Sequence, residues 1–140
     1  MNRREFVALS ACAATLNAVP AVAGVDGSLE YTPGLVEKHL AKGETVFLDF
    51  SATWCGTCKA QERVINALKS KNPAYGKAIT FVNVDWDNYG QGELAAWLNI
   101  PRRSTLVVLK GEDELGRVVA GTSKKTIKKL MDAALRAATA

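Results

Sequence analysis

The chain has 140 residues, of which 48% are hydrophobic and 23% charged, and its formal net charge is +4. This composition excludes a disordered or fibrous protein and is typical of one globular domain. The excess of positive charge is small and mixed with acidic residues, so it does not predict nucleic-acid binding. The lysines concentrated near the C-terminus fit the solvated face of a helix, and they are Lys124, Lys125, Lys128 and Lys129.

Residues 1–23 are predicted to be an export signal that precedes the domain. Arg3 and Arg4 come before a long uncharged stretch, which ends in the small-residue cleavage pattern Ala21-Val22-Ala23. The paired arginines resemble the twin-arginine export class. We therefore predict a signal peptide over 1–23, a single domain over 24–140 and a periplasmic location.

Of the three cysteines in the chain, Cys12 lies within the predicted signal. Lipidation at Cys12 and a permanent membrane anchor are the two alternatives to cleavage, although polar residues dilute the hydrophobicity of the stretch. Cleavage would leave Cys55 and Cys58. In an oxidising compartment, a lone pair at this spacing predicts a redox couple, because a structural zinc site needs four ligands.

Taken in chain order, the hydrophobic patterns predict alternating helices and strands. They indicate a weak strand near 27–31, a helix from Thr32 and Pro33 to Gly43, a strand over 45–51, a helix from Cys58 to Leu68, a strand over 79–84, a helix over 91–98, a strand over 105–110, an edge strand over 114–120, and a last helix capped by Ser123 and ending near Ala138. Right-handed crossovers between parallel strands then place helices on both faces of one mixed sheet.

Both cysteines lie in the segment Trp54-Cys55-Gly56-Thr57-Cys58, between a predicted buried strand and a predicted helix. Together with the preceding strand, this segment resembles the active site of thioredoxins, and the similarity runs through most of residues 29–137. The resemblance implies an α/β thioredoxin fold with a mixed sheet of four to five strands. It also implies a thiol–disulfide oxidoreductase that needs no organic cofactor.

The chemistry of the two cysteines follows from their place at a helix start. A thiolate is the nucleophile in disulfide exchange, and the N–H groups and dipole at a helix N-terminus stabilise its charge. We therefore predict that Cys55 attacks a substrate disulfide and that Cys58, one turn later, resolves the mixed disulfide. The resemblance further implies that Trp54, Ser104 and Thr105 contact the substrate.

Two acidic residues are predicted near the cysteines. Asp49 occupies the position of the buried acid thought to move protons in thioredoxins. Phe81 stands where the usual lysine partner would be, so we expect a raised pKa for Asp49. Glu62 follows Cys58 by one helical turn and resembles an acid in the C-terminal domain of the transmembrane reductase DsbD, which shares the pattern W-C-x-x-C-K-x-x-E. A solvated glutamate on the helix surface is the alternative.

The loop before Thr105 departs from the thioredoxin pattern. Ser104 stands where thioredoxins carry a cis-proline, and Pro101 lies three residues earlier. A cis bond costs about 3 to 4 kcal/mol before other residues but only about 0.5 to 1 kcal/mol before proline. We therefore expect a trans Arg103–Ser104 bond, with the guanidinium of Arg102 or Arg103 near the cysteines to offset the acids. The N–H and hydroxyl of Ser104 would then face the substrate.

The sequence as a whole predicts an exported reductase of protein disulfides. Its expected partners are disulfide-containing exported proteins and a membrane thiol carrier that supplies electrons, and we expect a monomer. The alternatives are a disulfide oxidase or isomerase on the same fold, a module whose two thiolates hold copper, zinc or an iron–sulfur cluster, and a non-catalytic binding domain.

Overall fold

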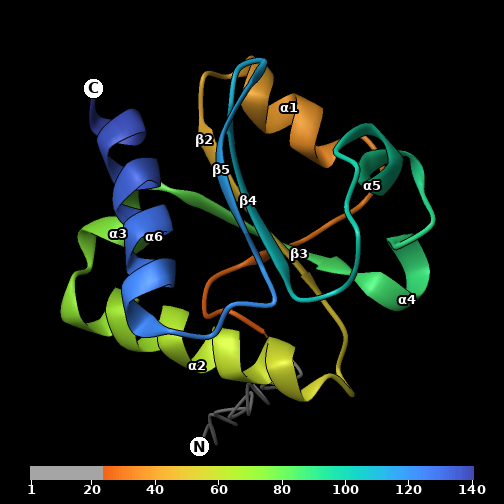
Figure 1. Cartoon of the computed structure of the whole chain (residues 1–140). Coiled ribbons are helices and arrows are strands. Elements are labelled where there is room, and N and C mark those ends of the chain that lie inside the picture. The colour runs from red at the N-terminus through yellow and green to blue at the C-terminus, as the bar shows by residue number, and fades with distance from the viewer. Residues whose placement is uncertain (1–23) are drawn as a thin grey trace, which may run out of the picture.

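The computed structural model describes residues 24–140, which form a five-stranded sheet with helices on both faces (Figure 1). The strands lie in the order β1-β3-β2-β4-β5. Strand β3 runs parallel to β1 and β2, whereas β4 is antiparallel to β2 and β5. The predicted mixed α/β sheet is therefore confirmed. The predicted signal over 1–23, with Cys12, lies outside the described residues.

Most predicted elements are present, with shifted ends. The strands are β1 (Leu29–Glu30), β2 (Thr45–Ser51), β3 (Thr80–Asp85), β4 (Thr105–Lys110) and β5 (Asp113–Val119). The helices are α1 (Leu35–Ala41), α2 (Gly56–Lys71), α3 (Ala74–Ala78), α4 (Trp86–Tyr89), α5 (Glu93–Trp97) and α6 (Lys124–Thr139).

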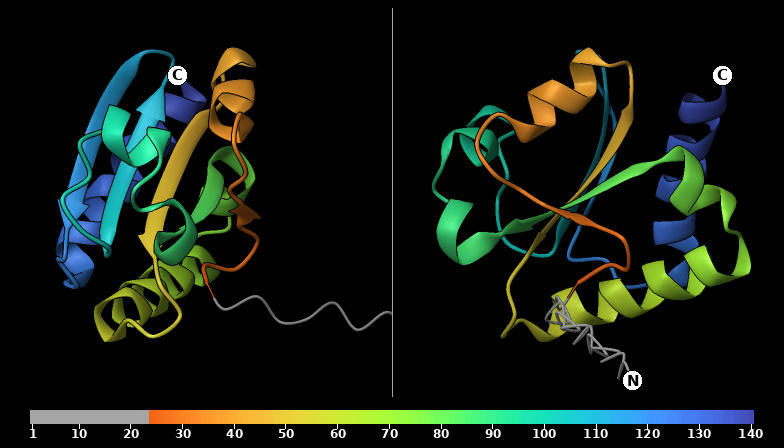
Figure 2. Two further views of the ribbon diagram at one scale, coloured as in Figure 1. Left: turned by 90° about the vertical axis from the view of Figure 1, so that its right-hand side faces the viewer. Right: turned by 180° about the vertical axis from the view of Figure 1, so that it is seen from behind.

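Two hydrophobic layers lie on opposite sides of the sheet. The helices that cover these two faces can be followed in the two views of Figure 2. Side chains alternate along a strand, so Leu48 and Phe50 of β2 pack into the layer that includes α1 and α5. Phe47 packs into the other layer with residues of α2, α3 and α6. Asp49 belongs to the same alternation as Phe47. Its side chain is therefore directed to the face covered by α2, the helix that carries the cysteines.

The first helix is shorter than predicted. It begins at Leu35 because Gly34, in a left-handed conformation with φ 89°, occupies the cap position. Thr32 and Pro33 form a turn instead, in which the Leu35 N–H donates to the Thr32 carbonyl at 3.0 Å. Gly43, with φ 80°, ends this region in the left-handed conformation that favours glycine.

The region between β3 and β4 also differs from the prediction. In place of one helix over 91–98 there are two short ones, α4 and α5, because the Asp85 side chain accepts from the Asp87 N–H and starts α4 early. Helix α3, which begins after Pro73, was not predicted. Helix α2 reaches Lys71, three residues past the predicted end at Leu68.

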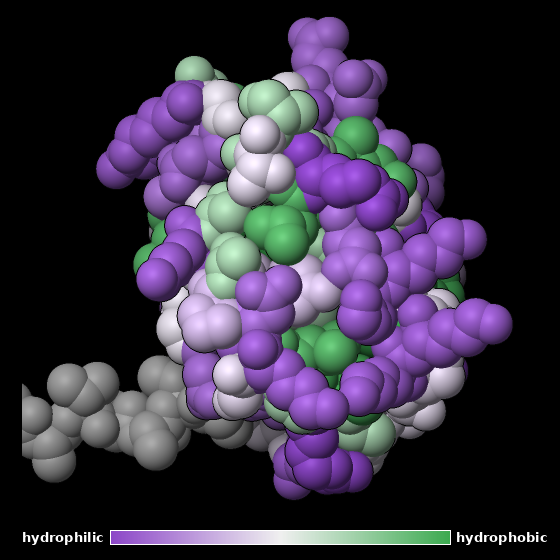
Figure 3. Space-filling model, turned by 90° about the vertical axis from the view of Figure 1, so that its left-hand side faces the viewer, coloured by the Kyte–Doolittle hydropathy of each residue, from purple (hydrophilic) through white to green (hydrophobic). Residues whose placement is uncertain are grey.

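Helix α6 confirms the predicted cap and the predicted solvated face. The Ser123 hydroxyl accepts from the Thr126 N–H, and the four lysines of the helix are exposed. Figure 3, which looks onto the side of the molecule that bears α3 and α6, shows mostly hydrophilic side chains with small separate hydrophobic areas. Within residues 24–140, no helix is long and apolar enough to cross a membrane.

Candidate active site

Cys55 and Cys58 form a disulfide at the start of α2. Cys55 is the cap residue of the helix, and its sulfur accepts from the Cys58 N–H at 3.2 Å. The predicted environment of the nucleophile is therefore present, because a helix N-terminus and a backbone donor both favour a thiolate on Cys55. Both residues are almost fully buried, with 2% and 0% of their surfaces exposed.

Trp54 lies beside the disulfide with 58% of its surface exposed. Its indole N–H donates to both carboxylate oxygens of Asp87, at 3.0 and 3.1 Å. The Arg103 guanidinium lies over the ring, 4.4 Å from its centre. These contacts hold an exposed aromatic surface in a fixed position next to Cys55. This geometry suits the predicted substrate contact through Trp54.

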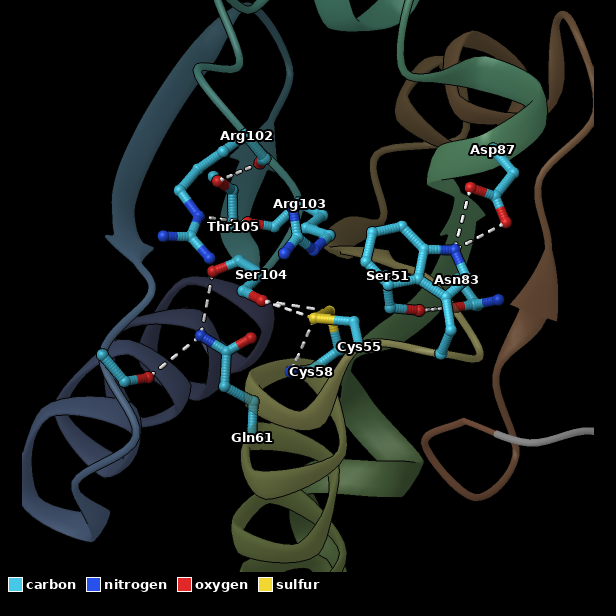
Figure 4. Close-up of a disulfide and its surroundings, with 12 residues drawn as sticks. Ser51, Cys55, Cys58, Gln61, Asn83, Asp87, Arg102, Arg103, Ser104 and Thr105 are labelled. Carbon is cyan, nitrogen blue, oxygen red and sulfur yellow. Dashed lines mark hydrogen bonds between the residues drawn. A yellow bond between two sulfur atoms is a disulfide. The ribbon is translucent and has the colours of Figure 1, made fainter.

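Ser104 lies directly against the disulfide. Its hydroxyl oxygen is 3.2 Å from the Cys55 sulfur and 3.0 Å from the Cys58 sulfur, and the close-up shows the hydroxyl directed at both (Figure 4). None of the peptide bonds in the described chain is cis, so the predicted trans Arg103–Ser104 bond is present. The backbone of Ser104 is left-handed, with φ 61°.

The hydroxyl of Ser104 faces the cysteines as expected, but its N–H does not, and a contact between Ser104 and substrate stays a prediction. Ser104 is fully buried, and its N–H donates to the Phe50 carbonyl at 2.7 Å. Its carbonyl accepts from the Ala120 N–H at 2.8 Å. The left-handed turn therefore directs the N–H and carbonyl of Ser104 into the protein and the hydroxyl toward the sulfurs.

Gln61 is a site residue that the sequence analysis missed. It lies three residues after Cys58 on α2 and is fully buried. Its amide nitrogen donates to the carbonyls of Ser104 and Gly121, at 3.0 and 2.9 Å. Two carbonyl partners require the NH₂ group of the side chain at this position. Gln61 thus joins the cysteine helix to the loop that carries Ser104.

The loop before β4 is held mainly by its own hydrogen bonds. Thr105 is fully buried, and its hydroxyl donates to the Arg102 carbonyl at 2.7 Å. The predicted substrate contact through Thr105 therefore has no exposed side chain to support it. The Arg102 side chain donates to the Arg103 carbonyl at 3.0 Å. Of the two arginines, Arg103 lies over the Trp54 ring, while a guanidinium beside the cysteines themselves stays a prediction.

Asp49 is buried without a partner. Within residues 24–140, neither of its carboxyl oxygens has a hydrogen-bond partner. Desolvation, followed by the negative charge of Glu62, raises the pKa of Asp49 from 3.8 to about 8. No positive charge among the described residues lowers the pKa of Asp49. The arginine that was expected to offset the acids therefore does not stabilise the Asp49 carboxylate. Phe81, at the position of the lysine that thioredoxins carry, packs in the hydrophobic layer.

Glu62 is half-buried on α2 and acts electrostatically on Asp49. Desolvation raises the pKa of Glu62, while Lys59 and Arg63 oppose the rise. Glu62 also lines a cavity of about 160 Å³ together with residues that include Lys59, Ser51 and Asn83. Because Glu62 is half-buried, the fully solvated alternative for this residue does not apply.

Comparison with known proteins agrees with this geometry. The family model described as Thioredoxin matches residues 29–133. The chain belongs to the thioredoxin family. It is 31% identical over 98 residues to Thioredoxin H2-1 of Oryza sativa subsp. japonica, covering 70% of this chain and 66% of that protein. It is 32% identical over 110 residues to a thioredoxin of Echinococcus granulosus, covering 78% of this chain and 96% of that protein.

Solved thioredoxin structures share the fold. Trxlp from Edwardsiella tarda EIB202 has a TM-score of 0.64 and 26% identity, covering 74% of this chain and 98% of that one. Thioredoxin NaTrxh from Nicotiana alata has a TM-score of 0.62 and 27% identity, covering 79% of this chain and 95% of that one. The chain thus spans almost the whole of these two proteins but just under two thirds of the rice relative.

With its cysteine pair in the C-x-x-C position, this member of the thioredoxin family is a thiol–disulfide oxidoreductase that acts on protein disulfides. The metal-handling alternative lacks further ligands, since no group of three or more His, Cys, Asp or Glu residues in the described domain could hold a metal ion. Two thiols alone fall short of the four ligands of a structural zinc site.

Proposed function

We propose that this protein is an exported reductase that works in the periplasm. In this proposal, Cys55 attacks a disulfide in an exported protein, Cys58 resolves the mixed disulfide, and a membrane thiol carrier returns two electrons to the Cys55–Cys58 pair. The protein acts as a monomer. The oxidase or isomerase on the same fold is the competing function.

Export is supported by the sequence of residues 1–23, which lie outside the match to the family model over 29–133. A charged start with Arg3 and Arg4, an uncharged stretch and a cleavage pattern at Ala23 are the parts of an export signal. The family domain does not include these residues, so a separate targeting role is open to them.

The observation that carries the reductive direction is the buried, unpaired Asp49. With a pKa of about 8, Asp49 holds a proton at neutral pH instead of a charge, because desolvation and Glu62 disfavour negative charge in this region. A cysteine thiolate formed nearby meets the same penalty. Strong oxidants of this chemistry are strong because their reduced form is stabilised. A site that destabilises the thiolate also destabilises the reduced form of the cysteine pair, so the reduced protein tends to donate its electrons to a substrate disulfide.

Asp49 also supplies a place for the proton of the resolving thiol. Cys58 must lose its proton before its sulfur attacks the Cys55 sulfur in the mixed disulfide. An acid is most effective in proton transfer when its pKa lies near the working pH. Ionised Asp49 can accept this proton as the Cys55–Cys58 bond forms, and the substrate sulfur leaves as a thiolate that takes a proton from water. At pH 7, a pKa of about 8 leaves about one Asp49 in ten ionised.

The direction is tested by the reduction potential of the Cys55–Cys58 pair, measured against a glutathione buffer. We expect a reduction potential close to that of a reducing thioredoxin, about −270 mV, whereas a strong oxidase would have a reduction potential of about −120 mV. A value close to the oxidase end would overturn the reductase in favour of its competitor.

Export and substrates are tested together in cells that express the full chain. Fractionation should find the protein in the periplasm, and replacing Arg3 and Arg4 by lysine should retain it in the cytoplasm, although the charge is unchanged. Cys58→Ser in the exported protein should trap substrates on Cys55, while the double variant Cys55→Ser/Cys58→Ser should trap none. A wild-type protein that stays in the cytoplasm would contradict the proposal.

A further inference from the structure

The hydroxyl of Ser104 has an unusual set of neighbours. Among the described residues, its hydrogen-bond contacts are the sulfurs of Cys55 and Cys58, at 3.2 and 3.0 Å. Since both sulfurs are joined in a disulfide here, neither has a hydrogen to donate. The Ser104 hydroxyl is therefore the donor, and it lies within reach of whichever sulfur carries negative charge.

The rest of Ser104 is fixed so that its hydroxyl stays in this place. Its N–H is held by Phe50, and its carbonyl accepts from Ala120 and from the Gln61 amide. The left-handed φ of 61° is uncommon for a residue other than glycine. A residue held in such a conformation by three neighbouring groups on separate segments is over-determined by its surroundings, which is how functional strain is retained.

The surroundings of the cysteines explain why a donor is needed. The burial that keeps Asp49 of β2 protonated and the charge of Glu62 on α2 both disfavour negative charge, and no cation pairs with Asp49 in the described domain. Lys59 acts on Glu62, and Arg103 from the loop lies over Trp54. Disulfide exchange nevertheless requires a thiolate first on Cys55 and then on Cys58. A neutral donor aimed at both sulfurs can stabilise each in turn.

We propose that the Ser104 hydroxyl, positioned by Gln61, donates a hydrogen bond to each active-site sulfur as that sulfur becomes a thiolate. In the reduced protein it donates to the Cys55 thiolate. That thiolate attacks one sulfur of the substrate disulfide, and the other substrate sulfur leaves as a thiolate. Once Cys58 has lost its proton to ionised Asp49, the hydroxyl turns to the Cys58 thiolate. Attack of this thiolate on the Cys55 sulfur re-forms the internal disulfide and releases the second substrate sulfur as a thiolate. Ser104 keeps its own proton throughout.

This inference rests on the disulfide chemistry of the family and not on export or on the reductive direction. It is therefore tested on purified full-length protein by titrating thiolate absorbance. Every variant carries Cys12→Ser, so that only the site thiols titrate. Ser104→Ala should raise the pKa of Cys55 by about one unit, a tenfold loss of thiolate at a given pH, as expected for a lost hydrogen bond to a charged group.

A second experiment tests whether the Ser104 hydroxyl donates a hydrogen bond to both sulfurs. In a Cys55→Ala background, where Cys58 is the remaining site thiol, Ser104→Ala should raise the pKa of Cys58 by a similar amount. Thr57→Ala is the matched control, because it removes a hydroxyl from the same motif that has no hydrogen bond to either sulfur. Unchanged pKa values of both cysteines in Ser104→Ala would overturn the proposal, and a shift of Cys55 alone would overturn the hand-over to Cys58.

Two further variants separate the hydroxyl from the fold. Ser104→Gly removes the same hydroxyl at a position whose φ favours glycine, so it tests the proposal even if the alanine variant does not fold. Gln61→Met should also raise the pKa of Cys55. Adding Ser104→Ala to it should then raise that pKa little further, because both changes remove the same interaction. Additive shifts would show that Gln61 acts on the thiols without Ser104.

Discussion

The two halves of the active site differ in how closely they follow the thioredoxin pattern. The half on β2 and α2 carries the expected tryptophan, the expected cysteine pair and the expected buried acid, and the helix start supplies the donors that the chemistry needs. The half on the loop before β4 has a trans, left-handed serine where thioredoxins carry a proline. A neutral hydroxyl thus faces the sulfurs, which a proline ring cannot supply.

The difference shows how one site can divide its work between two segments. The helix half decides which sulfur attacks, because the cap position favours the thiolate on Cys55. The loop half adjusts how readily that thiolate forms, since Ser104 offers a donor and Gln61 fixes it in place. Substitutions in the first half should therefore remove activity, while those in the second should shift its energetics.

The largest expected effect is the loss of chemistry in the cysteine variants. Cys55→Ser should abolish disulfide reduction, because it removes the nucleophile at the helix cap. Cys58→Ser should instead accumulate mixed disulfides on Cys55, since the first attack proceeds and the second cannot. Both are measured by turnover of a protein disulfide and by non-reducing electrophoresis. Equal trapping by the two variants would show that the assignment of the nucleophile is wrong.

The next largest effect concerns the pH dependence of stability. Asp49 has a pKa of about 8 in the folded protein against an ordinary value of 3.8, so the folded state binds more protons between these limits. The stabilising contribution of Asp49 is fully present below about pH 4 and is lost as the pH rises through 8. Asp49→Asn removes this loss. Its stability relative to the wild type should increase from pH 5 to pH 8, by up to about 1.4 kcal/mol per pH unit.

Urea unfolding at several pH values measures this difference. Asp132→Asn is a useful control, because hydrogen bonds from Lys128 and Tyr75 lower the pKa of Asp132, so this group is ionised in both the folded and the unfolded state and its difference from the wild type should stay constant between pH 5 and pH 8. The Asp132 carboxylate is partly exposed, so its effect should be small. If Asp49→Asn and the wild type kept a constant difference across this range, Asp49 would ionise in the folded protein much as it does in the unfolded chain.

A smaller loss of stability is expected when the connection between the two halves is cut. Gln61→Met keeps the unbranched shape of the side chain but removes the hydrogen bonds to the Ser104 and Gly121 carbonyls. Ser104 retains its bond from Ala120, so the cost should be about 2 kcal/mol, as for one or two buried hydrogen bonds. Gln91→Met, at an exposed position, should change the stability by less than about 0.5 kcal/mol. A similar small value for Gln61→Met would mean that the connection does not hold the loop.

The contrast between the halves also marks what the sequence could predict. The strands β2 and β4, the cap of α6 and the cysteine turn have strong local signals, and each was predicted within two residues. The trans bond before Ser104 followed from the cost of a cis peptide. The left-handed turn that buries Ser104 did not, because it depends on Phe50 and Ala120, which are far away in the chain.

Gln61 was not identified as a site residue from the sequence, for a related reason. A glutamine on a predicted helix is most often solvated, and nothing local marks its two carbonyl partners, which lie 43 and 60 residues later in the chain. A signal was nevertheless available in the spacing. Gln61 follows Cys58 by three residues, so the helical repeat places it on the same face as a buried cysteine. An interior glutamine must find hydrogen-bond partners, and the loop at Ser104 provides one of them.

The smallest expected effect belongs to Glu62, where the two halves of the site act on the same thiol. Glu62 is half-buried one turn after Cys58, and its charge raises the pKa of Asp49. Removing a nearby negative charge favours the thiolate, so Glu62→Gln should lower the pKa of Cys55, the opposite of Ser104→Ala. The shift should be about half a unit or less and should shrink at high salt, because Glu62 is only half-buried and salt screens its charge. Thiolate absorbance measures the pKa, with Glu93→Gln on the opposite face of the sheet as the matched control. An unchanged or raised pKa of Cys55 would remove Glu62 from the site and leave Asp49 as the acid that opposes the Ser104 hydroxyl.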